Sequence, residues 1–255
     1  MTDSNFSWYP GHIKKAEDEL RKHWLPLVDQ VIELVDARIP LSGFYPRREL
    51  WQGKPLLTLY TRRDLCDLEF FPKTLQKKLI DGKRPEAWRR FVLQELERLG
   101  EPVLEKLKRQ GRSRKLRVGV CGLPNVGKST FLNGLSGLGR KAKTGHKPGV
   151  TRQIQSVESD ALTIMDTPGL MPIALPKDEA YLLALCGLIP EKLFDPLDLA
   201  AILQSTLKET YSTQLEKLPK RIDLYEPDSE NLTDAEKLLH DFQSGKLGKL
   251  NLEKP

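Results

Sequence analysis

The stretch GLPNVGKST at residues 122–130 has the residue types and spacing of a loop that binds nucleotide phosphates. Its glycines let backbone N–H groups approach phosphate oxygens, and Lys128 would reach the β- and γ-phosphates. The Ser129 hydroxyl would bind Mg²⁺, and the positive end of a helix beginning near Lys128 would face the same anion. The alternative is a glycine-rich turn between a strand and a helix that binds no ligand.

A second motif, DTPG at 166–169, follows a short apolar run that we predict to be a strand. Asp166 would hold Mg²⁺ through water, and the Gly169 N–H would contact the γ-phosphate. The intervening segment PGVTR contains Thr151, whose hydroxyl would complete the Mg²⁺ coordination when a triphosphate is bound. Taken alone, DTPG is a common turn and Thr151 a surface threonine, but their order after the glycine-rich loop favours a phosphate and metal site.

A third stretch, TRRD at 61–64, resembles the base-reading sequence NKxD with two residues changed. The Asp64 carboxylate can accept hydrogen bonds from both N1–H and N2–H₂ of guanine, and adenine does not offer that pair. Arg62 can lie over the plane of the base. Because Thr61 replaces the asparagine that normally ties this loop down, a polar turn after a strand is the alternative interpretation.

The motifs occur in an order that is reversed relative to ordinary GTPases, in which the phosphate loop precedes the base-reading loop. From the N-terminus the order is WYPGHIKKA at 8–16, VDARIP at 35–40, TRRD, GLPNVGKST, PGVTR and DTPG. This order resembles that of the circularly permuted ribosome-assembly GTPases of the YlqF/RbgA family, and the closing HDFQSGKLGKLNLEKP is similar to their C-terminal segment. The resemblance covers most of the chain and is loosest at 175–235. Permutation is tolerated where the original termini lie close together at the surface.

The resemblance implies that GTP or GDP binds with Mg²⁺, that GTP is hydrolysed, and that the large ribosomal subunit and its rRNA are partners. It assigns nucleotide contacts to Thr61, Arg62, Arg63, Asp64, Pro124, Asn125, Val126, Gly127, Lys128, Ser129, Thr130 and Gly169. It assigns the metal to Ser129, Thr151 and Asp166. The Ser-Ala loop that usually helps to recognise guanine is not visible between 65 and 115, so we expect a guanine preference weaker than that of an intact NKxD protein.

The residue that would position the attacking water differs from that of Ras-type GTPases, which place a glutamine directly after the DxxG glycine. Leu170 occupies that position and cannot form a hydrogen bond through its side chain. Asn125 resembles the potassium ligand of cation-dependent GTPases, so K⁺ is a candidate cofactor, and Lys128 would stabilise charge on the phosphates. His12 is a further catalytic candidate because histidine titrates near neutral pH, and packing of its turn against the sheet is the alternative role.

The elements that must position these residues alternate between strands and helices. Apolar runs predict strands at 31–35, 55–60, 116–121 and 161–166, with helices at 13–24, through most of 65–115, and after the phosphate loop. We therefore predict an α/β fold, in which a circularly permuted P-loop GTPase domain with a mostly parallel sheet flanked by helices is followed by a small all-α domain. The predicted domains are 1–173 and 174–255. Because 65–115 contains no convincing strand, the sheet should be one strand shorter than in a complete GTPase domain.

Two helix starts support the all-α domain, which we expect to bind RNA. Asp195-Pro196 combines an N-cap with a proline at the first helical position, and TDAE at 233–236 matches a capping box. Apolar stripes follow the two starts, at Leu199, Ile202, Leu203 and Leu207 and at Ala235, Leu238, Leu239 and Phe242.

The charge balance favours a polyanionic partner, because 41 Lys and Arg against 35 Asp and Glu leave a formal net charge of +6 in 255 residues. Two basic clusters fit an RNA surface or simply a solvated face: Lys106, Lys108, Arg109, Arg112, Arg114, Lys115 and Arg117, then Arg140, Lys141, Lys143 and Lys147. The three cysteines show no metal or disulfide spacing, and neither a signal peptide nor a membrane span is visible. We therefore expect a cytoplasmic monomer without a membrane partner.

A different class of function stays open at this point. The altered TRRD loop would also suit a non-hydrolysing or weakly guanine-selective nucleotide-binding scaffold that docks on RNA or protein. The set of Lys128, Ser129, Thr151 and Asp166 favours a GTPase. A tRNA-modification GTPase is a third interpretation, but no added catalytic cysteine motif supports it.

Overall fold

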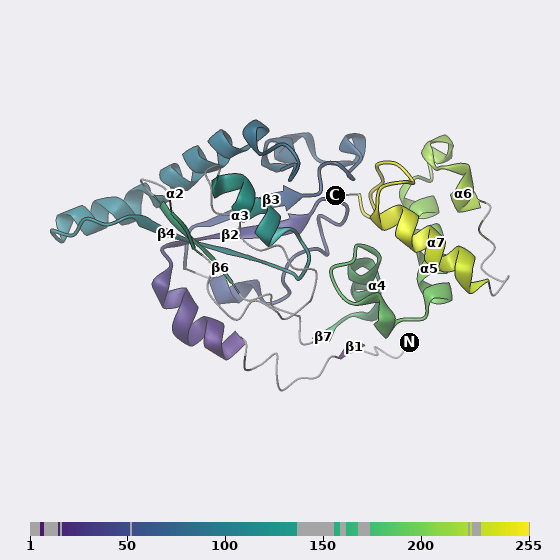
Figure 1. The fold of residues 1–255 in the computed structure, drawn as a ribbon, viewed down its shortest axis with the longest axis horizontal. Helices are drawn as coiled ribbons and strands as arrows, with labels where there is room; N and C mark the ends of the chain where they lie inside the picture. Colours follow the sequence, from purple (N-terminus) through teal and green to yellow (C-terminus); the bar gives the residue numbers. More distant parts are fainter. Residues whose placement is uncertain are drawn as a thin grey trace.

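A five-stranded sheet with the strand order β3-β2-β4-β6-β5 forms the centre of the protein (Figure 1). The computed structural model describes residues 6–7, 15, 17–51, 53–136, 156–158, 162–167, 174–223, 225 and 231–254. The strands of the sheet are β2 Gln30–Asp36, β3 Leu56–Thr61, β4 Leu116–Gly122, β5 Ser156–Glu158 and β6 Leu162–Asp166. The four strands predicted from apolar runs are therefore confirmed, each within a residue of its expected bounds.

Four of these strands are parallel, and only β5 pairs antiparallel, at the edge beside β6. Parallel strands covered on both faces consist of continuous apolar runs, and β2 is buried along its whole length. The carboxyl ends of β2, β3, β4 and β6 meet at one edge of the sheet, the position at which α/β proteins bind ligands. The predicted base-reading, phosphate and metal motifs all follow these strand ends.

Helices cover both faces of the sheet. Helix α2, Arg89–Arg109, packs on one face, where a Cβ added at its Gly100 would lie 2.2 Å from the Leu116 side chain. The opposite face is covered by a helical segment that ends in the π-helix η1, Leu20–Trp24, and a Cβ at Gly119 would lie 2.0 Å from the Trp24 ring. Both glycines are needed because the neighbouring side chain fills the space of a Cβ.

The region 65–115, all of which the structure describes, contains no regular strand, as predicted. It consists of the 3₁₀ segments η4 Leu68–Phe70, η5 Lys73–Lys78 and η6 Pro85–Ala87, followed by α2. A single parallel bridge joins Leu79 to Tyr60 of β3. Helix α3, Lys128–Ser136, follows the phosphate loop as expected.

The C-terminal region is helical after a short strand, β7 Ala174–Leu175, which pairs antiparallel with β1 Phe6–Ser7. Its helices are α4 Lys177–Leu185, α5 Pro196–Thr210, α6 Lys220–Asp223 and α7 Leu232–Gln243, with the 3₁₀ segments η7 Glu191–Leu193 and η8 Leu215–Lys217. No sequence pattern predicted β7, because a strand of two residues shows no alternation. The division of the chain at residue 173 stays a prediction.

The two predicted helix starts had different outcomes. The start of α5 is confirmed, since the Asp195 carboxylate accepts a hydrogen bond from the Leu197 N–H at 2.8 Å. The predicted capping box at TDAE is wrong, because α7 begins two residues earlier with Asn231 as its N-cap. The Asn231 side chain accepts from the Asp234 N–H and donates to the Asp234 carboxylate, so this pair caps the helix in place of Thr233.

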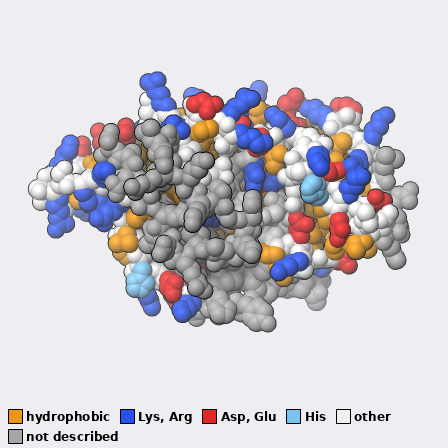
Figure 2. Space-filling view, in the orientation of Figure 1, with side chains coloured by type: hydrophobic (Ala, Val, Ile, Leu, Met, Phe, Trp, Pro, Cys, Tyr) orange, Lys and Arg blue, Asp and Glu red, His pale blue; other side chains and the backbone are white. Residues whose placement is uncertain are grey.

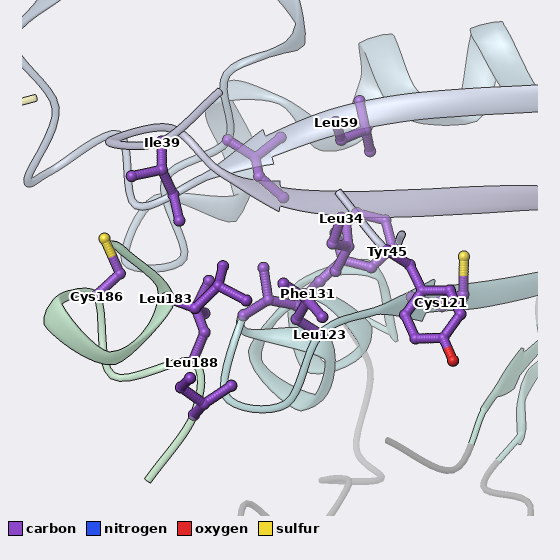
Figure 3. Packing of buried hydrophobic residues seen from close by; sticks show 14 of the residues in the cluster. Leu34, Ile39, Tyr45, Leu59, Cys121, Leu123, Phe131, Leu183, Cys186 and Leu188 are labelled. Atoms are coloured by element: carbon purple, nitrogen blue, oxygen red, sulfur yellow. The ribbon is translucent and has the colours of Figure 1, made fainter. Parts of the chain in front are cut away.

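One hydrophobic cluster runs from the sheet into the helical region (Figure 3). It includes Leu34 of β2 and Leu123 after β4, together with Leu183 and Leu188 from α4 and the turn that follows it. Among the residues that the structure describes, no helix is long and apolar enough to cross a membrane.

A buried ion pair, Asp36–Arg38, joins the end of β2 to the helical region. Arg38 is 2% exposed and donates through Nε and Nη2 to the Asp36 carboxylate, at 3.0 and 2.8 Å. The same Nη2 donates to the Cys186 carbonyl oxygen at 3.0 Å, and the guanidinium lies 5.3 Å from the centre of the Phe242 ring. The packing of the helical region against the end of β2 therefore depends on both Asp36 and Arg38.

We predict that Arg38→Met lowers the free energy of unfolding by about 3–5 kcal/mol, because it leaves the Asp36 carboxylate buried without its partner. Urea denaturation measures this loss. The matched control is Arg98→Met, since Arg98 pairs with Glu95 on the exposed surface of α2 and should change the midpoint little. Equal effects of the two substitutions would contradict the role assigned to the buried pair.

Candidate nucleotide-binding site

The phosphate loop connects β4 to α3 with three residues in positive-φ conformations, Gly122 at +145°, Asn125 at +56° and Gly127 at +104°. Glycine adopts such angles without strain, and asparagine tolerates the left-handed region better than most residues. A Cβ at Gly122 would also lie 2.6 Å from the Leu34 carbonyl oxygen. Successive N–H groups in such a loop can form the concave nest that binds anions, so the local structure suits phosphate.

Lys128, the first residue of α3, holds its ammonium group inside this loop. Its Nζ donates to the carbonyl oxygens of Gly122 at 3.0 Å and Leu123 at 2.8 Å. Burial lowers the pKa of Lys128, and the nearby Asp166 carboxylate opposes that shift. The cation is thus prepositioned on the loop's own backbone.

Asp166, the last residue of β6, is 3% exposed, and its Oδ1 has no hydrogen-bond partner among the described residues. Burial raises the pKa of Asp166 to about 6, against the Lys128 charge and the Thr167 N–H, which both favour the ionised form. Thr167 anchors this strand end, because its hydroxyl donates to the Val120 carbonyl oxygen at 2.8 Å. An unpartnered buried carboxylate oxygen beside the phosphate loop fits a site for a hydrated divalent metal.

Three of the predicted site residues, His12, Thr151 and Gly169, lie outside the described residues. Of the predicted metal ligands, the structure therefore describes Ser129, on the first turn of α3, and Asp166.

A cavity of about 240 Å³ lies between the TRRD loop and the start of α3. Its lining residues are Thr61, Arg62, Asp64, Ile80, Gly82, Lys83, Trp88, Val126, Gly127, Thr130 and Phe131. Six of these, Thr61, Arg62, Asp64, Val126, Gly127 and Thr130, are predicted nucleotide contacts. Of the other predicted contacts that the structure describes, Arg63, Pro124, Asn125, Lys128 and Ser129 are not in its lining.

Ile80, Gly82 and Lys83 complete the cavity. No sequence motif predicted them, because no second base-side loop is recognisable between 65 and 115. The loop is attached to β3 by a hydrogen bond from the Ile80 N–H to Tyr60 O at 2.7 Å, and to the TRRD loop by one from the Arg63 N–H to Ile80 O at 3.4 Å. The Asp81 carboxylate accepts from the Lys83 N–H at 2.8 Å, and the Trp88 indole donates to the Asp81 carbonyl oxygen at 2.7 Å. The DGK turn before Pro85 is the signal that could have revealed this loop.

The TRRD loop itself is held more firmly than its altered sequence suggested. The Thr61 hydroxyl donates to the Val35 carbonyl oxygen at 3.2 Å, which ties the ends of β3 and β2 together. Arg62 has a φ of +59°, and its Nη2 lies 3.3 Å from the Asn125 carbonyl oxygen. The Asp64 carboxylate forms an ion pair with Lys83 at 2.8 Å.

Asn125 connects the phosphate loop to the helical region. Its side-chain amide donates to the Gly187 carbonyl oxygen at 3.0 Å, in the turn that follows α4. The residue stands at the tip of the loop, exposed and away from the base cavity. Its predicted role as a cation ligand stays a prediction.

The chain is similar to a family model and to named relatives. A family model described as a 50S ribosome-binding GTPase matches residues 117–221. The protein named ribosome biogenesis GTPase A of Bacillus pumilus is 31% identical, and the match covers 97% of this chain and 98% of that relative. Its namesake from Bacillus licheniformis is 33% identical with the same coverage. Mitochondrial ribosome-associated GTPase 1 of Bos taurus is 33% identical over 78% of this chain and 65% of its own length.

Two solved structures share the fold. A GDP-bound structure of YlqF superposes with a TM-score of 0.59 at 23% identity, covering 92% of this chain and 98% of the other. The GNP-bound YlqF from T. maritima gives a TM-score of 0.57 at 23% identity, over 94% and 98%.

We predict that Asp166→Asn stabilises the nucleotide-free, metal-free protein above pH 6. An unfolded aspartate has a pKa of about 3.9, and burial in the folded protein raises it to about 6. Stability from the protonated carboxyl is therefore present below pH 4 and is lost as the pH rises through 6. Asparagine avoids that loss, so the gain should approach about 3 kcal/mol at pH 7.5 and be only about 1 kcal/mol at pH 4.5.

Urea denaturation at the two pH values measures this difference. Asp198→Asn, at an exposed position on α5, is the control and should show no comparable pH-dependent gain. An equal gain at pH 4.5 and pH 7.5 for Asp166→Asn would contradict the assignment of the raised pKa.

Proposed function

Because this chain belongs to the family of the proteins named ribosome biogenesis GTPase A, we propose that it binds and hydrolyses GTP as a switch in assembly of the large ribosomal subunit. The observation that carries the proposal is the arrangement at one sheet edge of Lys128 and Asp166 beside a nest-shaped loop, with Asp64 in the adjoining cavity. The phosphate chain of GTP would lie on the loop and the base in the cavity.

The chain's own residues provide binding, orientation and charge. The backbone of the phosphate loop holds the phosphates, and Lys128 transfers its hydrogen bonds from the loop carbonyls to phosphate oxygens. Ser129, Thr151 and Asp166 would hold Mg²⁺, which supplies positive charge between the β- and γ-phosphates when bound. Asp64 orients guanine through its N1–H and N2–H₂.

The position after the DxxG glycine, Leu170, offers no hydrogen bond to water. We assign water positioning and charge stabilisation to other residues, with Asn125 as a ligand of K⁺ and His12 as a catalytic group that approaches the phosphates. The role of Asn125 is supported by its exposed position in the phosphate loop, where its φ is +56°. A binding scaffold that does not hydrolyse GTP is the competing function, and the altered TRRD loop is its support.

The test is GTP and ATP turnover by the full chain, with and without large ribosomal subunits. We expect slow GTP turnover alone, faster in K⁺ than in Na⁺, and a large further increase with subunits. Asn125→Ala should abolish the difference between K⁺ and Na⁺. Lys128→Ala should lower turnover about 10²-fold or more, because the substitution removes the ammonium charge that stabilises the transferred phosphate.

His12→Ala should reduce subunit-stimulated turnover while GTP affinity stays nearly unchanged. GTP binding without any turnover in the presence of subunits would replace the proposed switch with the scaffold. If ATP competed with GTP equally well, the proposed selectivity for guanine would be wrong.

We also propose that rRNA contacts the helical region 174–255 and the basic end of α2. Figure 2 shows Lys and Arg side chains at the end of the molecule where α2 extends beyond the sheet in Figure 1. Lys106, Lys108 and Arg112 are exposed there. Arg114 instead forms two hydrogen bonds to the Asp29 carboxylate, at 2.6 and 2.8 Å, so we assign it a structural role and leave it out of the RNA surface.

Changing Lys106, Lys108 and Arg112 together to Gln should weaken binding to large-subunit rRNA and reduce the slope of log affinity against log salt by roughly 2–3. The matched control changes three exposed lysines outside both proposed RNA-binding regions, Lys22, Lys73 and Lys77, to Gln. Filter binding at several salt concentrations measures both. An identical salt slope for the triple variant and the wild type would exclude α2 from the RNA surface.

A further inference from the structure

The base cavity contains a cation that the sequence motifs do not assign. Lys83 Nζ lies 2.8 Å from Oδ2 of Asp64, the carboxylate that would read guanine. The Lys83 side chain is 79% exposed and that of Asp64 is 26% exposed, so both are accessible from the open side of the cavity. An exposed ion pair of this kind contributes little to stability, and a role in the fold does not explain its position.

The loop that carries Lys83 is firmly held against the two loops that would contact the nucleotide. Ile80 bonds to Tyr60 on β3 and to the backbone of Arg63, inside the TRRD loop. A Cβ added at Gly82 would lie 2.6 Å from the Thr130 side chain on α3, so this backbone approaches the helix as closely as glycine allows. Lys83 therefore starts from a fixed backbone position at the rim of the cavity.

Guanine presents three polar groups in a row along one edge: N2–H₂, N1–H and the O6 carbonyl. The two oxygens of Asp64 can accept from the first two. O6 then lies beside the carboxylate and requires a donor, and a lysine within hydrogen-bond distance of Oδ2 is adjacent to that place. Adenine carries an amino group at the same position, which would meet the ammonium donor to donor, and its N1 is an acceptor that would face the carboxylate.

We propose that Lys83 donates a hydrogen bond to O6 of guanine and is, with Asp64, the residue that determines base selectivity. This inference rests on the proposed function, since it needs a guanine nucleotide in the cavity. It explains how a chain with Thr61 and Arg62 in the base-reading loop can still select guanine. A site that pairs every polar group of the correct base rejects a wrong base because its own groups are then left unpaired.

The test is calorimetry on the full chain with four diphosphates, those of guanosine, inosine, adenosine and 2-aminopurine riboside. Guanine and hypoxanthine carry O6, and adenine and 2-aminopurine do not. Lys83→Met, which keeps the unbranched chain as far as Cε and removes the ammonium group, should weaken GDP and IDP about tenfold each, the effect of one charge-assisted hydrogen bond. It should leave ADP and 2-aminopurine riboside diphosphate unchanged or slightly tighter.

Two further variants separate the roles of the residues. Lys83→Arg keeps a cationic donor and should retain most of the GDP preference. Asp64→Ala should weaken GDP more than IDP, because hypoxanthine lacks the N2 amino group. Lys77→Met, an exposed lysine on η5 outside the cavity lining, is the matched control and should bind all four ligands as the wild type does.

The opposite sign would overturn the inference. If Lys83 only forms a surface ion pair with Asp64, guanine must displace the lysine from the carboxylate. Lys83→Met would then bind GDP as tightly as the wild type or more tightly. An equal loss of affinity for all four nucleotides would also contradict a contact between Lys83 and O6. A wild-type chain that does not prefer GDP to ADP would defeat the proposed function itself, whereas a wild-type preference that Lys83→Met retains in full defeats only this inference.

Discussion

The burial of a charged pair at the end of β2 is the constraint on which the rest of the molecule depends. Asp36 is fully buried, and it accepts hydrogen bonds from the Arg38 backbone N–H, Nε and Nη2. Charges removed from water are tolerated only when they are paired and their remaining hydrogen-bonding groups are covered. From the helical region, the Cys186 carbonyl oxygen accepts from Nη2 and the Phe242 ring lies beside the guanidinium, whereas Nη1 has no hydrogen-bond partner among the described residues. The helical region is thus part of the packing at the sheet edge.

The turn that follows α4 is shared between this pair and the phosphate loop. Adjacent carbonyl oxygens, those of Cys186 and Gly187, accept from Arg38 and from the Asn125 side chain. The closing segment adds a further contact at the same edge, because the Leu252 N–H donates to the Arg38 carbonyl oxygen. The phosphate loop, the end of β2 and the helical region therefore meet at one place.

The reversed order of the motifs does not prevent them from meeting at one edge of the sheet. Parallel strands bring their carboxyl ends to one edge whatever the order in which the chain visits them. The base cavity accordingly combines residues from 61–64, 80–83 and 126–131, and the register of β2 with both β3 and β4 aligns these segments. Loops that are distant in the sequence act as neighbours because the sheet aligns the strand ends.

The sequence by itself determined the parts of the protein whose signals are local. Strands buried on both faces appear as apolar runs, and the phosphate loop appears as a spacing of glycine, lysine and serine within nine residues, so both could be predicted. The start of α5 could be predicted for the same reason, since an aspartate followed by proline caps a helix on its own. At α7 the local pattern gave a wrong prediction, because Asn231 and Thr233 could both cap the helix and Asn231 formed the hydrogen bond.

Only the tertiary structure decided what surrounds Asp64 and Arg38. Lys83 reaches the base cavity because Leu79 bridges to Tyr60, a contact of one residue that leaves no periodic pattern in the sequence. Arg38 is buried because Cys186 and Phe242, both more than a hundred residues away, pack against it. Spacing predicts which groups can do chemistry, but the partner of each charge depends on long-range packing, which no local pattern encodes.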